Sequence, residues 1–273
     1  MSKKNFKTIK AELCVDRKEY ITPHYIRVYL KGEEVKIFQN TTVGVNNKIL
    51  VPPKGLNKVY FPEFDYESMQ WKPQPEALKP AVRTYTHRGI NLEDNEMWID
   101  FVAHGEEGPA SAWAINAKKG DVLGLMMHDG QTELYTKADW YLLVADATGI
   151  PVIASILEDL PAEAKGVCIL EVFGKEDEQK LDTKADIRFI WLHNQHPQET
   201  SNLPSYVKQQ NLPETSKFGY VAAEFNSVKE IRTYLRKTKN WKREELNAYS
   251  YWKSGVAEDK SAVERHEENE VTV

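Results

Sequence analysis

The sequence predicts a β domain followed by an α/β domain, and two patterns along the chain support this prediction. Up to about residue 135, short apolar runs are separated by prolines and glycines, as in antiparallel sandwiches and barrels. Beyond residue 138, continuous apolar runs alternate with helical stripes, as buried parallel strands alternate with crossover helices. The length of 273 residues also exceeds that of one typical domain. We therefore expect domains over residues 1–136 and 137–273.

The first half contains several runs with strand character and one short helix. The expected strands cover residues 25–30, 48–51, 97–102 and 121–126, where apolar residues alternate or cluster. Prolines 52, 53, 73, 75 and 80 interrupt any helix between the second and third of these strands. A helix is expected over residues 111–117.

The second half contains four strands, two helices and an acidic tail. The strands are expected over residues 140–145, 167–173, 187–192 and 218–223. Residues 151–160 and 227–237 carry apolar residues at helical spacing, with Ser227 as the expected N-cap of the second helix. The tail from 256 to 273 is interpreted as either a helix or a frayed end.

Composition excludes several classes of function. A net charge of -5 disfavours a protein that wraps nucleic acid. The two cysteines, Cys14 and Cys168, lack the paired spacing of a zinc or iron–sulfur site and fit a reducing compartment. No apolar run approaches the ~20 residues of a membrane span, and no signal-peptide pattern follows the charged N-terminus. We expect a cytoplasmic protein with no membrane span and no resident metal.

Residues 104–114, HGEEGPASAWA, form a turn that can bind phosphate. They follow an expected strand and run into the short helix, whose first backbone N–H groups attract anions. Gly105, Gly108, Ala110 and Ser111 are small enough to let a pyrophosphate approach the main chain. On composition alone, a glycine-rich hairpin with an ordinary helix cap is the favoured interpretation.

Residues 81–88, AVRTYTHR, form a strand that can serve a flavin. Arg83 and Tyr85 share one strand face because side chains alternate. The arginine can pair with phosphate, the tyrosine ring can lie against an isoalloxazine, and the Thr86 hydroxyl can bond near its reactive nitrogen. An exposed strand with a cross-strand aromatic residue is the alternative interpretation.

Together and in this order, the two segments resemble the siderophore-interacting family of flavin reductases, whose FAD site has Arg-x-Tyr-Ser/Thr followed by His-Gly…Gly-Pro-Ala-Ser-x-Trp. The resemblance continues through Gly120-Asp121, through residues 141–161 with Asp146 and Thr148, and into residues 251–255, YWKSG. It implies a ferredoxin-reductase-like fold. A Greek-key β-barrel would hold FAD, and a Rossmann-like parallel α/β domain of the NAD(P)H-binding type would follow.

The resemblance also implies an oxidoreductase that reduces ferric iron held by a siderophore in the cytoplasm. Electron transfer would pass through the flavin, without a catalytic side chain. Lys48, Lys253 and Lys260 would attract the ferric siderophore. The implied FAD-binding residues are Arg83, Thr84, Tyr85, Thr86, His104, Gly105, Gly108, Pro109, Ala110, Ser111, Trp113, Ala114, Asp146 and Thr148.

The electron donor is left open between NAD(P)H and reduced ferredoxin. This chain has Ala147 and Ala223 where the family commonly has glutamate and glycine, and the second domain contains no GxGxxG fingerprint. Two alternative functions also stay open: a flavin reductase of the same fold acting on quinones or a protein partner, and a non-catalytic ferric-siderophore-binding protein. His193 and His196 are interpreted as loop residues rather than metal ligands.

Overall fold

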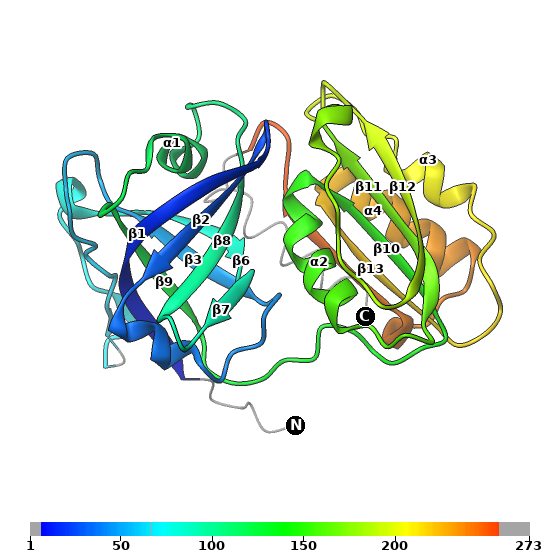
Figure 1. The fold of residues 1–273 in the computed structure, drawn as a ribbon, viewed down its shortest axis with the longest axis horizontal. Helices are drawn as coiled ribbons and strands as arrows, with labels where there is room; N and C mark the ends of the chain where they lie inside the picture. Colours follow the sequence, from blue (N-terminus) through cyan, green and yellow to red (C-terminus); the bar gives the residue numbers. More distant parts are fainter. Residues whose placement is uncertain (1–6, 66, 257–273) are drawn as a thin grey trace. The chain divides into compact units, whose positions relative to one another are not determined.

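The computed structural model describes residues 7–65 and 67–256. By their contacts, these residues form two compact units, and the boundary in the sequence lies between Thr132 and Glu133. The sequence predicted this boundary a few residues later. We call the two units the N-terminal unit and the C-terminal unit (Figure 1). Lys260 and the acidic tail lie outside the described residues.

The N-terminal unit is built on a seven-stranded antiparallel sheet with strand order β6-β3-β9-β1-β2-β8-β7. A separate two-stranded hairpin, β4–β5, lies in the segment between β3 and β6. The strands are β1 Thr8–Thr22, β2 Tyr25–Lys31, β3 Asn46–Val51, β4 Phe64–Asp65, β5 Gln70–Trp71, β6 Ala81–Thr86, β7 Gly89–Asn91, β8 Glu96–Val102 and β9 Val122–His128.

The chain itself joins the two edges of this sheet into a barrel. Edge strands β6 and β7 are consecutive in sequence, so the residues between them must cross from one edge to the other. The His87 N–H donates to Val45 O on the β3 side, and the Arg88 N–H donates to Trp98 O on β8. The sheet is thus a partly closed barrel whose edge strands are β6 and β7.

The barrel interior is an apolar core closed at one end by a helix. Val28, Leu30, Ile99 and Phe101 are fully buried because alternate residues of β2 and β8 point inward. Helix α1, Pro109–Asn116, adds Ala110 and Ala114 to the same core. The helix begins two residues before the expected position because Pro109 occupies its first turn.

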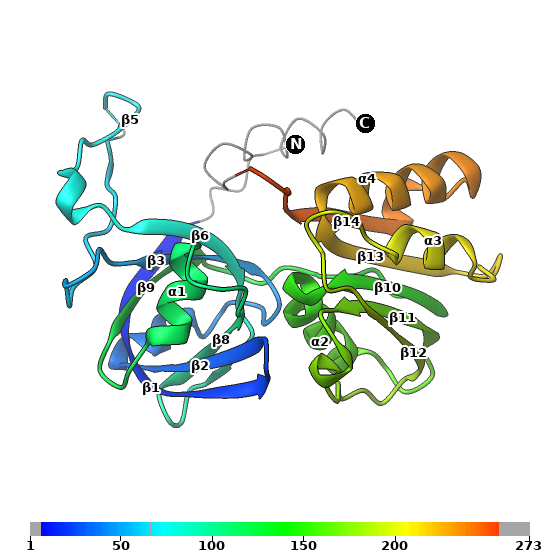
Figure 2. The same cartoon turned by 90° about the horizontal axis from the view of Figure 1, so that it is seen from above.

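The C-terminal unit is a parallel five-stranded sheet with strand order β12-β11-β10-β13-β14. Helix α2 lies on one face, and α3 and α4 lie on the other (Figure 2). The strands are β10 Trp140–Asp146, β11 Lys165–Val172, β12 Asp186–His193, β13 Lys217–Glu224 and β14 Leu246–Trp252. The helices are α2 Ile150–Asp159, α3 Leu203–Lys208 and α4 Phe225–Thr233, which continues as a π-helical turn to Thr238.

The expected β and α/β halves are confirmed, while one cap and one loop assignment are wrong. Ser227 is a buried residue inside α4, and the N-cap is Glu224, whose carboxylate accepts from the N–H groups of Asn226 and Ser227. His193 ends strand β12 and bonds to Glu178 at 2.8 Å instead of lying in a loop. No helix within the described ranges is long and apolar enough to cross a membrane.

Candidate functional site

The turn before α1 is held by a single serine hydroxyl. Ser111 Oγ accepts from the His104 N–H at 3.1 Å and donates to Gly105 O at 2.6 Å. Ser111 is buried, so these bonds fix the His104–Gly105 loop against the first turn of the helix. The Ser111 side chain therefore shapes the turn instead of facing a ligand.

The start of α1 offers backbone donors without a capping side chain. Gly108 is the N-cap and makes no side-chain cap bond, so the N–H groups of Ala110 and Ser111 lack the usual local acceptor. Gly105 has φ of 103°, and a Cβ built there meets nothing within 4 Å, so space lies open before the backbone. An open turn at a helix N-terminus suits a phosphate.

Strand β6 carries Arg83 and Tyr85, and Tyr85 is connected to α1 through aromatic rings. The Tyr85 ring lies 4.7 Å from the ring of Phe101 on β8, and Phe101 lies 5.6 Å from Trp113 on α1. This row of aromatic rings orients Tyr85 and links the strand to the helix. Arg83 Nη1 donates to Val82 O at 2.7 Å and is half-buried, while Thr86 is buried on the opposite strand face.

A lysine on the neighbouring strand is tied to the same segment. β3 and β6 are antiparallel, and Lys48 lies directly opposite Thr84. Lys48 Nζ donates to Thr84 Oγ1, so the expected substrate lysine and an expected cofactor residue form one contact. Among the expected substrate residues, Lys48 is the one in the N-terminal unit.

These residues fit a dinucleotide cofactor with an anionic pyrophosphate and an aromatic ring. The uncapped turn of α1 and the Arg83 guanidinium supply donors for phosphate, and Tyr85 supplies a held aromatic face. Gly105 leaves the main chain accessible, whereas a Cβ at Gly108 would lie 3.0 Å from His104 Cε1. The chemistry of the donor set therefore fits FAD.

The carboxyl edge of the C-terminal sheet is organised around Asp146, at the end of β10. Its carboxylate accepts from the Thr148 N–H and hydroxyl, from the Glu224 N–H at 2.8 Å and from Trp252 Nε1 at 2.7 Å. Burial raises the pKa of this carboxyl, although these donors act in the opposite direction. Asp146 thus joins the ends of β10, β13 and β14.

At the switch point of this sheet, several of the chain's own residues contact one another. Strand order reverses between β10 and β13, the place where doubly wound sheets usually bind nucleotides. A Cβ at Gly149 would lie 2.3 Å from Ala222 O, so α2 starts directly against β13. Trp252 reaches from β14 to Asp146 on β10. These contacts tie the strand ends to one another at the switch point.

Lys253 follows β14 and lies over the ring of Phe225, with Nζ 4.6 Å from the ring centroid. The next residue, Ser254, is fixed by its N–H to Glu224 and by its hydroxyl to Gln198 O. Lys253 is therefore held at the same carboxyl edge as Asp146. Within residues 7–65 and 67–256, no group of three potential metal ligands occurs, in keeping with His193 pairing with Glu178.

Family models match both units of the chain. Residues 14–132 match the siderophore-interacting FAD-binding domain, and residues 138–255 match the siderophore-interacting protein model. Ferric vibriobactin reductase ViuB of Vibrio cholerae serotype O1 is 33% identical over 252 residues, which are 92% of this chain and 92% of the relative. The chain belongs to the siderophore-interacting protein family.

Solved structures agree with this membership. The siderophore-interacting protein SipS from Aeromonas hydrophila has a TM-score of 0.81 at 28% identity, covering 96% of this chain and 98% of that one. A siderophore utilization protein from T. fusca has a TM-score of 0.82 at 28% identity, covering 93% and 96%. The ferredoxin reductase of carbazole 1,9a-dioxygenase, at 15% identity and a TM-score of 0.61, covers 91% of this chain and 70% of its own. It shows the ferredoxin-reductase-like fold.

In this siderophore-interacting protein, the N-terminal unit is an FAD-binding domain. Sequence reasoning missed Phe101, Trp252 and Glu224, which hold the expected site residues in place. Phe101 and Trp252 lie within segments that the sequence singled out, but their contacts join strands distant in sequence. A local pattern carries no signal for such contacts.

Proposed function

We propose that this chain is an FAD-dependent ferric-siderophore reductase that converts Fe(III) to Fe(II) in the cytoplasm. The observation that supports it best is the presence of three features in one unit. The N-terminal unit carries the uncapped turn of α1 with its phosphate donors, the Arg83–Tyr85 face of β6 with its aromatic ring and, on the opposite face of β6, the Lys48–Thr84 contact with its cation. The similar ferric vibriobactin reductase is named for this activity.

Bound FAD would supply the redox chemistry, accepting an electron pair and passing single electrons to iron. Fe(III) prefers hard oxygen ligands more strongly than Fe(II) does, so reduction weakens the siderophore's hold on the metal. Each electron reduces one Fe(III), and no proton from a side chain is required for that transfer. The residues of this chain therefore bind and orient rather than catalyse.

We assign the cofactor contacts to two segments of the N-terminal unit. Arg83 and the backbone donors of residues 108–114 hold the pyrophosphate, Tyr85 supports the isoalloxazine, and Thr84 and Thr86 bond around it. His104 and Gly105 border the turn. Asp146 and Thr148 contribute to the cofactor site indirectly, by holding strand ends in place. The Asp146 carboxylate already accepts hydrogen bonds from donors of its own unit.

We assign Lys48 and Lys253 to attraction of an anionic ferric siderophore. The test is binding of a ferric siderophore to FAD-loaded protein, followed by fluorescence quenching, in Lys48→Ala and Lys253→Ala. We expect each variant to lose affinity by about fivefold to tenfold while FAD content is unchanged. Lys36→Ala is the control, because Lys36 is exposed and pairs only with Glu33 among the contacts described. Unchanged affinity in both the Lys48 and the Lys253 variant would contradict the assignment.

The electron donor is proposed to be NAD(P)H or reduced ferredoxin. Contacts at the switch point favour a protein donor, since Trp252, Asp146 and the Gly149–Ala222 approach lie at the edge that a nucleotide would use. Stopped-flow bleaching of the flavin by NADH, NADPH and reduced ferredoxin, compared side by side, distinguishes these donors. Rapid saturable bleaching by a pyridine nucleotide alone would exclude the ferredoxin route.

A further inference from the structure

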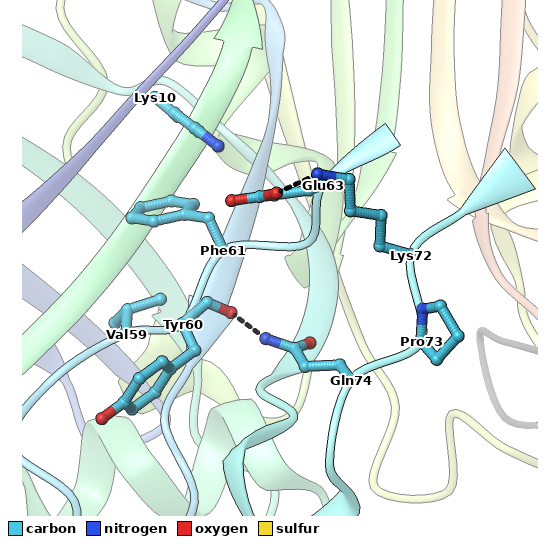
Figure 3. A pocket seen from close by; sticks show the side chains of 8 residues that line it. All are labelled: Lys10, Val59, Tyr60, Phe61, Glu63, Lys72, Pro73 and Gln74. Atoms are coloured by element: carbon cyan, nitrogen blue, oxygen red, sulfur yellow. Dashed lines mark hydrogen bonds and ion pairs between the residues drawn. The ribbon is translucent and has the colours of Figure 1, made fainter. Parts of the chain in front are cut away.

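A hollow of about 430 Å³ lies on the outer side of the barrel in the N-terminal unit. Figure 3 shows its lining, with Lys10 near Phe61 and the Glu63–Lys72 ion pair and Gln74 around the opening. Its volume is large enough to hold a ring-bearing arm of a ligand, since ligand sites begin near ~300 Å³. None of its lining residues belongs to the expected site.

The hollow exists because the segment between β3 and β6 is fastened over the sheet. The Val59 N–H donates to the Glu12 carboxylate of β1, and Val59 packs with Leu50 and Val122. Gly124 of β9 makes room for this segment, because a Cβ there would lie 2.8 Å from Val59 Cγ1 and 3.2 Å from Phe61 Cε1. The Gln74 amide donates to Tyr60 O at 2.8 Å and holds the far side.

Strand register connects this hollow to the proposed substrate lysine. Met126 of β9 pairs with Lys48 of β3 on one side and with Lys10 of β1 on the other, so the three form one row across the sheet. Adjacent strands are about 4.8 Å apart, which puts the Lys10 and Lys48 Cα atoms about 10 Å from each other. Met126 and Phe61 pack in the same apolar cluster, so both lysines border one surface.

The charges around the hollow leave a positive surplus. Lys72 and Glu63 neutralise each other at 3.0 Å, and Lys72 holds the pKa of Glu63 below its usual range. The Glu12 carboxylate accepts the Val59 N–H. Lys10 lies 5.3 Å from the Phe61 ring centroid, and Lys58 lies 5.6 Å from that of Tyr60. Two cations are thus presented against two aromatic rings.

We propose that this hollow, lined by Lys10 and Phe61, is a second subsite of the ferric-siderophore site and takes an anionic aromatic arm of the catecholate class. This inference rests on the proposed function. A tris-catecholate complex of Fe(III) is a polyanion with aromatic rings, whereas a tris-hydroxamate complex is neutral and lacks them. Lysines favour the polyanion, and the rings of Tyr60 and Phe61 favour stacking with an aromatic arm.

The test compares two ferric complexes on FAD-loaded protein by fluorescence quenching. The probes are the ferric complexes of 2,3-dihydroxybenzoate and of acetohydroxamate. We expect Lys10→Ala to weaken binding of the catecholate complex by about tenfold and to leave FAD content and hydroxamate binding unchanged. Phe61→Leu should weaken binding of the catecholate complex in the same way. Lys10→Arg should bind this complex with nearly wild-type affinity, and the control Lys36→Ala should match the wild type.

The outcomes separate this subsite from the proposed function. If the wild type binds and reduces the catecholate complex but Lys10→Ala binds it equally well, the subsite is wrong and the reductase stands. A wild type that prefers the hydroxamate complex also overturns the subsite. If the wild type neither binds nor reduces any ferric chelate, the proposed function itself fails. Lys10 is exposed, so its variants keep the test independent of folding.

Discussion

Arg83 lies on β6, an edge strand of the barrel. We expect its charge to contribute more to cofactor binding than to the stability of the fold. Its guanidinium is half-buried and donates to Val82 O. We predict that Arg83→Ala lowers FAD affinity by about tenfold or more, since a charge-assisted phosphate contact is among the stronger polar interactions. Equilibrium dialysis against FAD measures this loss. Arg188→Ala is the control, because Arg188 bonds to Gln210 in the other unit; equal losses in both variants would contradict the role of Arg83.

His87 is a buried histidine between β6 and β7. It is fully buried, and neither ring nitrogen has a hydrogen-bond partner among the described residues. Burial lowers its pKa from 6.5 to about 4, so the folded protein holds the ring neutral.

Because of the lowered pKa of His87, we predict that the protein loses stability in mild acid. Between about pH 6.5 and pH 4 the unfolded chain binds a proton at His87 that the folded chain does not, so stability is retained above this window and falls within it. The slope is at most about 1.4 kcal/mol per pH unit. Urea unfolding at several pH values with saturating FAD should show a shallower fall in His87→Leu than in the wild type. The exposed His196→Ala should keep the wild-type slope, and identical slopes in all three proteins would refute the assignment.

Residue patterns could predict the chemistry of the FAD site but not its supports. Strand alternation predicts that Arg83 and Tyr85 share a face, and the register of β6 agrees. Lys10 could not be recognised from the sequence, because its row with Lys48 depends on β9, more than a hundred residues further along the chain. The N-cap of α4 was predicted wrongly because the helix begins earlier than expected. The Glu224 carboxylate accepts from the first free N–H groups, and Ser227 lies inside the helix.

Asp146 connects three parallel strands of the C-terminal unit through hydrogen bonds to its carboxylate. We predict that Asp146→Ala destabilises the C-terminal unit by about 2–4 kcal/mol, because the N–H of Glu224 and the indole N–H of Trp252 lose their acceptor in a buried site. Asp146→Asn should cost less, since its amide oxygen still accepts. Urea unfolding followed by tryptophan fluorescence measures both. The exposed Asp186→Ala is the control, and a wild-type midpoint for Asp146→Ala would contradict this role.

Most central elements were predictable, and the missing ones have physical reasons. The buried strands β10, β11 and β13 are largely continuous apolar runs, as is typical of parallel strands that are covered on both faces. β1 was missed because its outward half is charged, and β14 because it is an edge strand with polar and aromatic residues. α3 has six residues, too few for a helical period to stand out.

The whole chain combines an FAD-binding barrel with a parallel α/β unit in which Trp252 and Asp146 connect the strand ends at the carboxyl edge. The change of hydrophobic period near residue 138 was enough to predict both architectures. The donor could not be predicted from the sequence, since Ala147 and Ala223 show only that a fingerprint is missing. The contacts of Trp252 and Gly149 at the switch point are the structural feature that favours the proposed protein donor.

The central claim is that reduced flavin on this chain delivers electrons to siderophore-bound iron. The most direct measurement mixes anaerobically reduced, FAD-loaded protein with a ferric catecholate in a stopped-flow instrument and traps Fe(II) with ferrozine. We predict that the flavin absorbance returns as Fe(II) forms, with about two Fe(II) for each flavin, because an electron pair is passed on singly. Flavin that stays reduced in the presence of ferric chelate, but is reoxidised promptly by a quinone, would contradict the account.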